Sequence, residues 1–225
     1  MRRVSVILLH GAGSTGAAAS ALLGDCMPPS IVVRTMEDRT GNIAGLLRRL
    51  DDAAAAAELL IGVSLGAHAL ARWVTGRSDG PPVILCLPAW TGAPDAVAVA
   101  TRDSASAVAR EGKAAVLARL PSDHGTSPGR IASLVRLGWS AYDDLELVAA
   151  LTMASQQWGP TSAELSAIST VCAVIGWPDD GLHPLKVAQD WAQMIPDAAY
   201  YAAESCDPIA LRVSVRTALA NLVTG

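Results

Sequence analysis

The chain of 225 residues is 51% hydrophobic and carries a formal net charge of −4. This length and apolar content suit one well-packed domain, and the scattered basic residues exclude an extended surface for nucleic acid or an anionic membrane. No apolar stretch is long enough to span a membrane. The cysteines lie far apart, two of them in apolar strand-like runs, so we expect free thiols in a reducing, cytoplasmic compartment rather than disulfides or a metal site. They are Cys26, Cys86, Cys172 and Cys206.

Short apolar runs alternate with helical patterns along most of the chain. Runs of strand length are predicted at residues 4–9, 31–33, 59–61, 83–87, 171–175 and 198–203. Helices are predicted at residues 17–23, 42–57, 66–74, 184–194 and 209–223. Strands that are apolar on both faces and separated by helices predict an α/β fold, with a mostly parallel central sheet and helices on both of its faces.

One segment interrupts this alternation. Residues 95–169 read as helical, with helices predicted at 104–120 and 131–157 and a turn-rich stretch between them. Because the segment leaves the sheet and returns to it, we expect a helical cap, or lid, over the carboxyl ends of the strands, where ligands bind in open α/β sheets. The core would then comprise residues 1–94 and 170–225. An extra helical layer packed on one side of the sheet is the alternative.

The sequence Gly62-Val63-Ser64-Leu65-Gly66 lies between a predicted strand and a predicted helix. Glycine on either side removes Cβ atoms that would collide where a strand and a helix meet at a sharp angle. Such a turn holds its serine in a strained conformation and exposes the Oγ atom above the end of the sheet. We therefore predict Ser64 as a nucleophile.

These motifs resemble those of the α/β-hydrolase superfamily. The residues that carry the likeness are the 62–66 turn, Leu9-His10-Gly11-Ala12-Gly13 after the first strand, and Gly176-Trp177-Pro178-Asp179 after the penultimate strand. The resemblance implies a compact version of a sheet that has eight strands in larger members, together with a Ser–acid–His triad. It also implies an oxyanion hole, with one N–H from Leu65 and another from the loop of Gly11 and Ala12. His10 is expected to be structural.

The acid is predicted to be Asp179, which follows the penultimate strand where the family places its carboxylate. Asp180 is the adjacent alternate, and Asp95 is a further candidate.

The base departs from the family pattern, because the loop after the last strand contains no histidine. In one interpretation His183 takes this role, since it immediately precedes the predicted helix at 184–194, and a helix N-terminus favours the neutral imidazole that a general base requires. In a second, His124 from the cap or His68 behind the serine assists. In a third there is no catalytic histidine, and the chain binds a ligand without efficient acyl turnover.

The sequence thus predicts a serine hydrolase, resembling an esterase or thioesterase, with Ser64, His183 and Asp179 as its triad. Its partner would be a small, apolar acyl compound, and no metal or organic cofactor is expected. The alternative is a triad-deficient protein of the same fold that acts as a lyase, cyclase or acyltransferase, or as a non-catalytic ligand-binding protein.

Overall fold

The computed structural model describes residues 3–223, and in this part of the chain six parallel strands form one sheet in the order β2-β1-β3-β4-β5-β6. The predicted α/β fold class is confirmed. The strands are β1 (Val4–Leu9), β2 (Ile31–Met36), β3 (Leu59–Val63), β4 (Val83–Cys86), β5 (Cys172–Gly176) and β6 (Ala199–Ala202).

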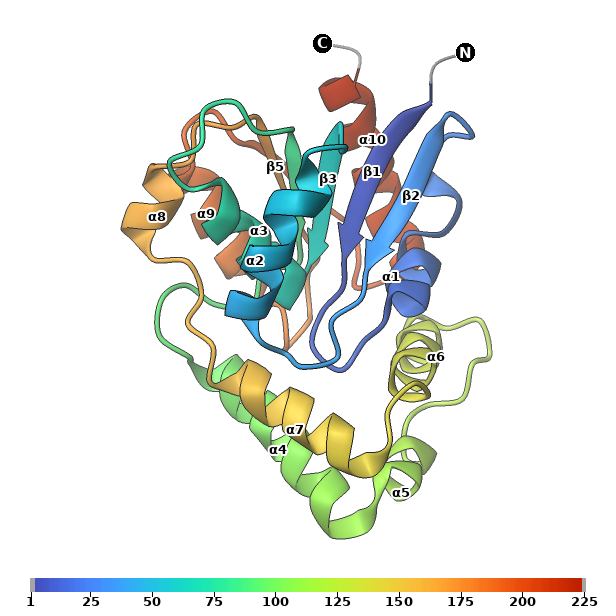
Figure 1. The fold of residues 1–225 in the computed structure, drawn as a ribbon. Helices are drawn as coiled ribbons and strands as arrows, with labels where there is room; N and C mark the ends of the chain where they lie inside the picture. Colours follow the sequence, from blue (N-terminus) through green and yellow to red (C-terminus); the bar gives the residue numbers. More distant parts are fainter. Residues whose placement is uncertain (1–2, 224–225) are drawn as a thin grey trace.

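Helices cover both faces of the sheet (Figure 1). One face packs against α2, α3, α8 and α9, and the other packs against α1 and α10. Every residue of β3, β4 and β5 is buried, as expected for central strands enclosed by helices. The α-helices are α1 (Gly16–Leu23), α2 (Ile43–Ala54), α3 (Leu65–Val74), α4 (Ala96–Glu111), α5 (Lys113–Ala118), α6 (Ser127–Trp139), α7 (Asp144–Ser155), α8 (Ser162–Ser166), α9 (Leu185–Met194) and α10 (Pro208–Val223), and a short 3₁₀ helix spans Gly24–Cys26.

Local sequence signals explain where helices begin. Asn42 starts α2, because its side chain accepts a hydrogen bond from the backbone N–H of Ala44 at 3.0 Å. Within α2, Leu46 and Leu50 lie on one face and are buried against the sheet. The helix thus follows the apolar spacing of its sequence.

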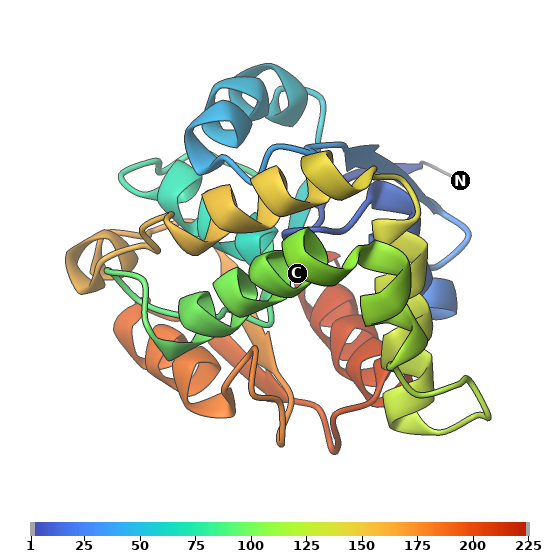
Figure 2. The same ribbon diagram turned by 90° about the horizontal axis from the view of Figure 1, so that it is seen from below.

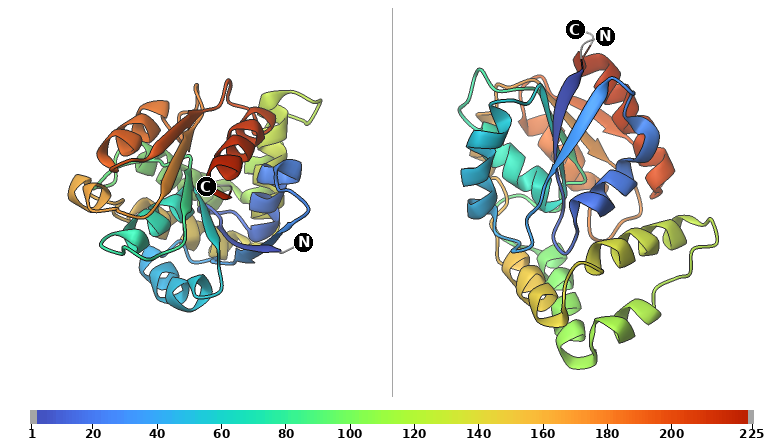
Figure 3. Two further views of the ribbon diagram at one scale, coloured as in Figure 1. Left: turned by 90° about the horizontal axis from the view of Figure 1, so that it is seen from above. Right: turned by 45° about the vertical axis from the view of Figure 1, so that its right-hand side comes forward.

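A helical layer made of α4, α5, α6 and α7 lies across the carboxyl ends of the strands (Figures 1 and 2). It has its own apolar cluster, which includes Val108, Trp139 and Leu147. By contrast, α8 leaves this layer and packs against α3 and α9 beside the sheet. Of the segment 95–169, only the part from α4 to α7 therefore covers the strand ends, while β1 starts and α10 ends on the opposite side of the molecule (Figure 3).

The helical layer contains more breaks than the sequence predicts. The predicted helix 104–120 is in fact α4 and α5, which are separated by Gly112 with a φ angle of 81°. The predicted helix 131–157 is α6 and α7. A capping box between Asp143 and Glu146 starts α7 as a separate helix, because each side chain accepts a hydrogen bond from the other residue's backbone N–H.

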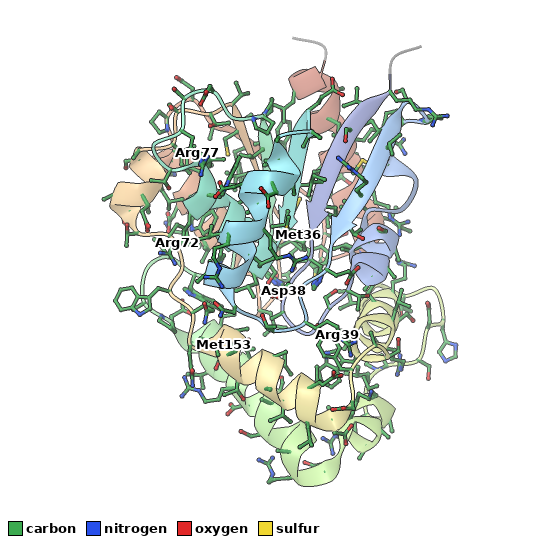
Figure 4. The ribbon with its side chains drawn as sticks, viewed as in Figure 1. Met36, Asp38, Arg39, Arg72, Arg77 and Met153 are labelled. Carbon is green, nitrogen blue, oxygen red and sulfur yellow. The ribbon has the colours of Figure 1, made fainter. Side chains whose placement is uncertain are left out.

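Polar contacts attach the helical layer to the sheet domain. Arg39, in the loop after β2, faces the layer (Figure 4) and forms an ion pair with Glu146 at 2.6 Å. The Tyr142 hydroxyl donates a hydrogen bond to the carbonyl of Ser14 at 2.8 Å. On the other side, Arg130 of α6 pairs with the carboxylate of Asp207, just before α10. These contacts fix the layer above the strand ends.

Candidate active site

Ser64 occupies the sharp turn between β3 and α3. Its φ and ψ angles are 55° and −116°, outside the regions that a residue with a side chain normally adopts. A Cβ atom on Gly62 would lie 2.5 Å from the carbonyl oxygen of Gly66, and one on Gly66 would lie 2.6 Å from the carbonyl oxygen of Leu9. Glycine is therefore required on both sides, and the predicted strained serine turn is present.

His183 joins the serine to a carboxylate. Its Nε2 atom lies 3.0 Å from Ser64 Oγ, and its Nδ1 atom lies 2.7 Å from Asp180 Oδ2. Ser64 precedes α3, whereas Asp180 and His183 belong to the loop between β5 and α9. The three side chains form a continuous chain of hydrogen bonds at the carboxyl end of the sheet. Of the sequence-predicted bases, His183 is the one in contact with Ser64.

Asp180 is held by three donors. Besides His183, the indole N–H of Trp177 donates to Oδ2 at 2.6 Å and the backbone N–H of Leu182 donates to Oδ1 at 2.7 Å. Burial opposes ionisation of this carboxyl group, but the hydrogen bonds and the His183 imidazole prevail and lower its pKa to about 2. Asp180 is therefore ionised at neutral pH and keeps a proton on Nδ1 of His183. This orientation leaves Nε2 to accept from the serine hydroxyl.

Asp179, the acid expected from the sequence, lies beside this chain of hydrogen bonds and not within it. Its side chain is exposed, and its φ angle of 57° turns the backbone between Pro178 and Asp180. The carboxylate that contacts His183 belongs to Asp180, the predicted alternate. Asp95 has a different role, since it caps α4 by accepting a hydrogen bond from the N–H of Val97.

The loop after β1 lies against the serine. A Cβ atom built on Gly11 would come within 3.0 Å of Ser64 Cβ and 3.4 Å of its Oγ, so a side chain here would crowd the serine and glycine favours this close approach. The buried His10 fixes the loop, because its Nδ1 atom lies 2.8 Å from the Gly11 carbonyl and its Nε2 atom accepts from the N–H of Asp38 at 3.0 Å. His10 is thus structural, as predicted.

The backbone N–H groups that were expected to form an oxyanion hole lie beside the cavity that contains Ser64. Leu65 opens α3, so its N–H has no acceptor within the helix and lies at the positive end of the helix dipole. Gly11 and Ala12 line the cavity that also holds Ser64 and His183. Both predicted sources of N–H groups therefore border one cavity.

The two other histidines weighed as bases lie elsewhere. His68 is fully buried in α3, and its Nε2 atom accepts from the N–H of Ala89 at 3.1 Å. Burial, and secondarily the nearby His183, lower the pKa of His68 to about 3, so it stays neutral at physiological pH. His124 is exposed between α5 and α6. Neither residue lines the cavity that contains Ser64.

This cavity has a volume of about 390 Å³ and lies between the sheet and the helical layer. Its walls are almost entirely apolar, and none of the lining residues is Asp, Glu, Lys or Arg. Trp90 and Trp139 line it, whereas Trp158 is 58% exposed and lies outside it. Because an ionised group costs much free energy to bury without a partner, the cavity suits an uncharged ligand. Ser14, Thr101 and Ser104 also line it, and its other apolar residues include Leu22, Val63, Leu87, Val97, Val116, Leu120, Ile131, Leu134, Val135, Leu151 and Leu182.

Two features of the site had no counterpart in the sequence predictions. The Trp177 indole that holds Asp180 belongs to a recognised motif, but a tryptophan beside a strand more often signals a core residue than a hydrogen-bond donor. The loop after β6, where the family pattern places a histidine, instead contains Asp207, which accepts hydrogen bonds from Ser127 and Arg130 of the helical layer. Within residues 3–223, no cluster of His, Cys, Asp and Glu could hold a metal ion, and no helix could cross a membrane.

This chain is similar to known proteins in its three-dimensional structure, and not detectably in its sequence. No protein-family model and no curated protein sequence matches the chain. An enol-lactonase from Burkholderia xenovorans LB400 has a similar structure, with a TM-score of 0.77, 16% identity and coverage of 100% of this chain and 93% of that one. A thermophilic esterase from Thermogutta terrifontis has a TM-score of 0.67 and 18% identity, with coverage of 99% and 90%.

A structure described with carboxylesterases of the archaeon Nitrososphaera gargenis is also similar, with a TM-score of 0.75, 14% identity and coverage of 99% and 89%. The likeness extends over the whole chain and includes both the sheet and the helical layer. Together with the serine turn and the parallel sheet, it confirms the fold that the motifs predicted: this chain adopts the α/β-hydrolase fold.

Proposed function

We propose that this protein is a serine hydrolase that cleaves small, uncharged esters or related acyl compounds. The observation that carries the proposal is the hydrogen-bond chain from Ser64 through His183 to Asp180, with distances of 3.0 and 2.7 Å. A serine hydroxyl is a weak nucleophile at neutral pH and needs an adjacent, correctly oriented base. This arrangement supplies one.

In the proposed reaction, Ser64 Oγ attacks the substrate carbonyl while its proton passes to His183 Nε2. The N–H of Leu65 and an N–H of the Gly11–Ala12 loop stabilise the negative charge on the carbonyl oxygen. The imidazolium then protonates the leaving alkoxide as its bond to the acyl carbon breaks. His183 then deprotonates a water molecule, which attacks the acyl-enzyme. The imidazolium returns this proton to Ser64 Oγ as its bond to the acyl carbon breaks, and the carboxylic acid is released. Asp180 stabilises the imidazolium in both steps.

The similar structures include proteins described as an enol-lactonase and esterases, which supports a hydrolase of this kind. The competing hypothesis from the sequence, a protein without a complete triad, depended on the missing histidine after β6. The contact between His183 and Ser64 argues for the hydrolase, because both nitrogens of this imidazole have the partners that a general base needs.

Hydrolysis of p-nitrophenyl butanoate tests the proposal. The wild-type protein should release p-nitrophenol with saturation kinetics, and Ser64→Ala should lower kcat by about 10³-fold or more while circular dichroism remains unchanged. Absence of hydrolysis over a series of neutral esters by the folded wild type, or full activity in Ser64→Ala, would contradict it.

A further inference from the structure

The indole N–H of Trp139 makes no hydrogen bond within residues 3–223 and, unlike that of Trp90, is not sealed from solvent. Trp139 ends α6, is only 9% exposed, and lines the cavity that contains Ser64. A Cβ atom built on Gly13 would lie 3.2 Å from Trp139 Nε1, so the donor faces the loop after β1. An unpaired N–H that can be reached from an apolar cavity is available to donate a hydrogen bond to a ligand oxygen.

The backbone around Trp139 is held in place by its contacts. A Cβ atom on Gly138 would lie 3.1 Å from the Gly13 carbonyl oxygen, so this turn of α6 rests directly on the loop. The Lys113 side chain donates a hydrogen bond to the carbonyl of Trp139 at 3.1 Å, and the Tyr142 hydroxyl donates one to the carbonyl of Ser14. The backbone that carries the donor is thus fixed before any ligand binds, which reduces the entropy lost on binding.

The position of the donor limits which ligand atom can reach it. Gly11 lies against Ser64, whereas the indole faces Gly13, two residues further along the loop. Two residues span at most about 7 Å. An acceptor at Trp139 Nε1 therefore belongs to the same ligand, within a few bonds of the carbonyl that Ser64 attacks. The absence of charged residues from the cavity wall favours a neutral acceptor.

We propose that Trp139 Nε1–H donates a hydrogen bond to an uncharged oxygen in the acyl part of the substrate. The substrate class is then a mainly apolar ester or lactone that carries an ether, ketone or ring oxygen a few bonds from its scissile carbonyl. This inference rests on the proposed function for its reaction, but the donor and its surroundings stand independently of it. Trp139 is a specificity-determining residue in this account.

Trp90 provides a matched control. It also lines the cavity, and its Nε1 atom likewise has no hydrogen-bond partner within the described chain. However, the Nε1 atom of Trp90 is fully enclosed by the protein, whereas that of Trp139 is not, so a ligand oxygen in the cavity cannot reach it. Its N–H should contribute nothing to oxygen recognition.

The experiment compares p-nitrophenyl hexanoate with its ethoxypropanoate isostere, in which oxygen replaces the γ-methylene group. The ratio of kcat/KM for the ether ester to that for the alkyl ester should fall about five- to tenfold in Trp139→Phe, the effect of one hydrogen bond to a neutral group. The ratio should stay within about twofold of the wild type in Trp90→Phe. Because both esters are measured on the same variant, changes in packing largely cancel. An unchanged ratio in Trp139→Phe, or an equal fall in Trp90→Phe, would overturn the inference.

A second measurement needs no turnover and therefore separates this inference from the proposed reaction. In Ser64→Ala labelled with ¹⁵N-tryptophan, the indole signal that disappears on adding Trp139→Phe belongs to Trp139. Saturation with methyl ethoxypropanoate should move this signal downfield, and methyl hexanoate should not. If neither p-nitrophenyl ester is hydrolysed by the wild type but the signal moves, the reaction is wrong and the oxygen subsite stands. A signal that both esters leave in place overturns the subsite.

Discussion

The Nε2 atom of His183 lies 3.0 Å from the Oγ atom of Ser64, although 119 positions separate the two residues in the chain. Asp180, the partner of His183, lies three residues before it in the same loop. The proposed acid and the proposed base therefore both belong to one short segment, residues 177–183, which follows β5. This geometry replaces the arrangement in which the histidine follows the last strand.

The two adjacent aspartates should differ sharply in their effects. Asp180→Asn should lower kcat for ester hydrolysis by about 10³- to 10⁴-fold, because the amide cannot hold the imidazole in the required tautomer or stabilise the imidazolium. Asp179→Asn should remain within about threefold of the wild type, since its exposed side chain does not contact His183. Steady-state kinetics with p-nitrophenyl butanoate measure both, and a larger loss in Asp179→Asn would show that the acid is misassigned.

Asp180 should also make stability depend on pH. Its pKa of about 2 in the folded protein lies below the value of about 3.9 expected when unfolded, so its ionised form stabilises the fold. This stabilisation is fully present above about pH 5 and is lost as the pH falls through about 2. The difference in free energy of unfolding between the wild type and Asp180→Asn should therefore shrink by about 2 kcal/mol over this range. Urea denaturation at several pH values measures it, and a constant difference would contradict the assigned pKa.

Trp177 should act as a positioning residue for Asp180. Removal of its N–H in Trp177→Phe leaves Oδ2 of the carboxylate with one donor fewer, so kcat should fall about tenfold while KM changes little. The acidic limb of the pH–rate profile should shift as well, because the orientation of His183 changes with that of Asp180. Trp191→Phe, which removes a donor to Thr91, is the matched control and should leave the profile unchanged. A change confined to KM would indicate a role in substrate binding instead.

The pair of Arg130 and Asp207 should stabilise the attachment of the helical layer. The Asp207 side chain is 8% exposed, so Arg130→Met would leave a buried carboxylate without its cation and should reduce the free energy of unfolding by about 2 to 3 kcal/mol. Arg119→Met removes an exposed pair with Glu111 and should change it by less than about 1 kcal/mol. Equal effects of the two substitutions on the free energy of unfolding would show that the pair of Arg130 and Asp207 does not stabilise the attachment of the helical layer.

The parts of the fold that repeat a simple pattern were predictable from the sequence. Apolar runs enclosed by helices predicted the parallel sheet, and the glycines around Ser64 predicted the strained turn. The helical layer was harder, because its helices share one apolar cluster and the breaks at Gly112 and before α7 depend on local capping. The capping residues Asp143 and Glu146 were visible in the sequence and could have located the second break.

The choice between Asp179 and Asp180 was beyond the sequence because both fit the same position after β5. The positive φ angle of Asp179 decides it, by turning the backbone so that the next carboxylate meets the imidazole. Hydrogen bonds from Trp177 and Leu182 then fix Asp180. Such conformations depend on how the whole loop packs, and residue spacing alone does not specify them.

The most direct test of a single-loop acid and base is the rate at which a fluorophosphonate probe labels Ser64. Attack on the probe requires an activated serine, so His183→Ala should slow labelling by about 10³-fold or more, and His124→Ala should label at the wild-type rate. Loss of labelling in Ser64→Ala identifies the site. Labelling of His183→Ala at the wild-type rate would contradict the central role of the contact between His183 and Ser64.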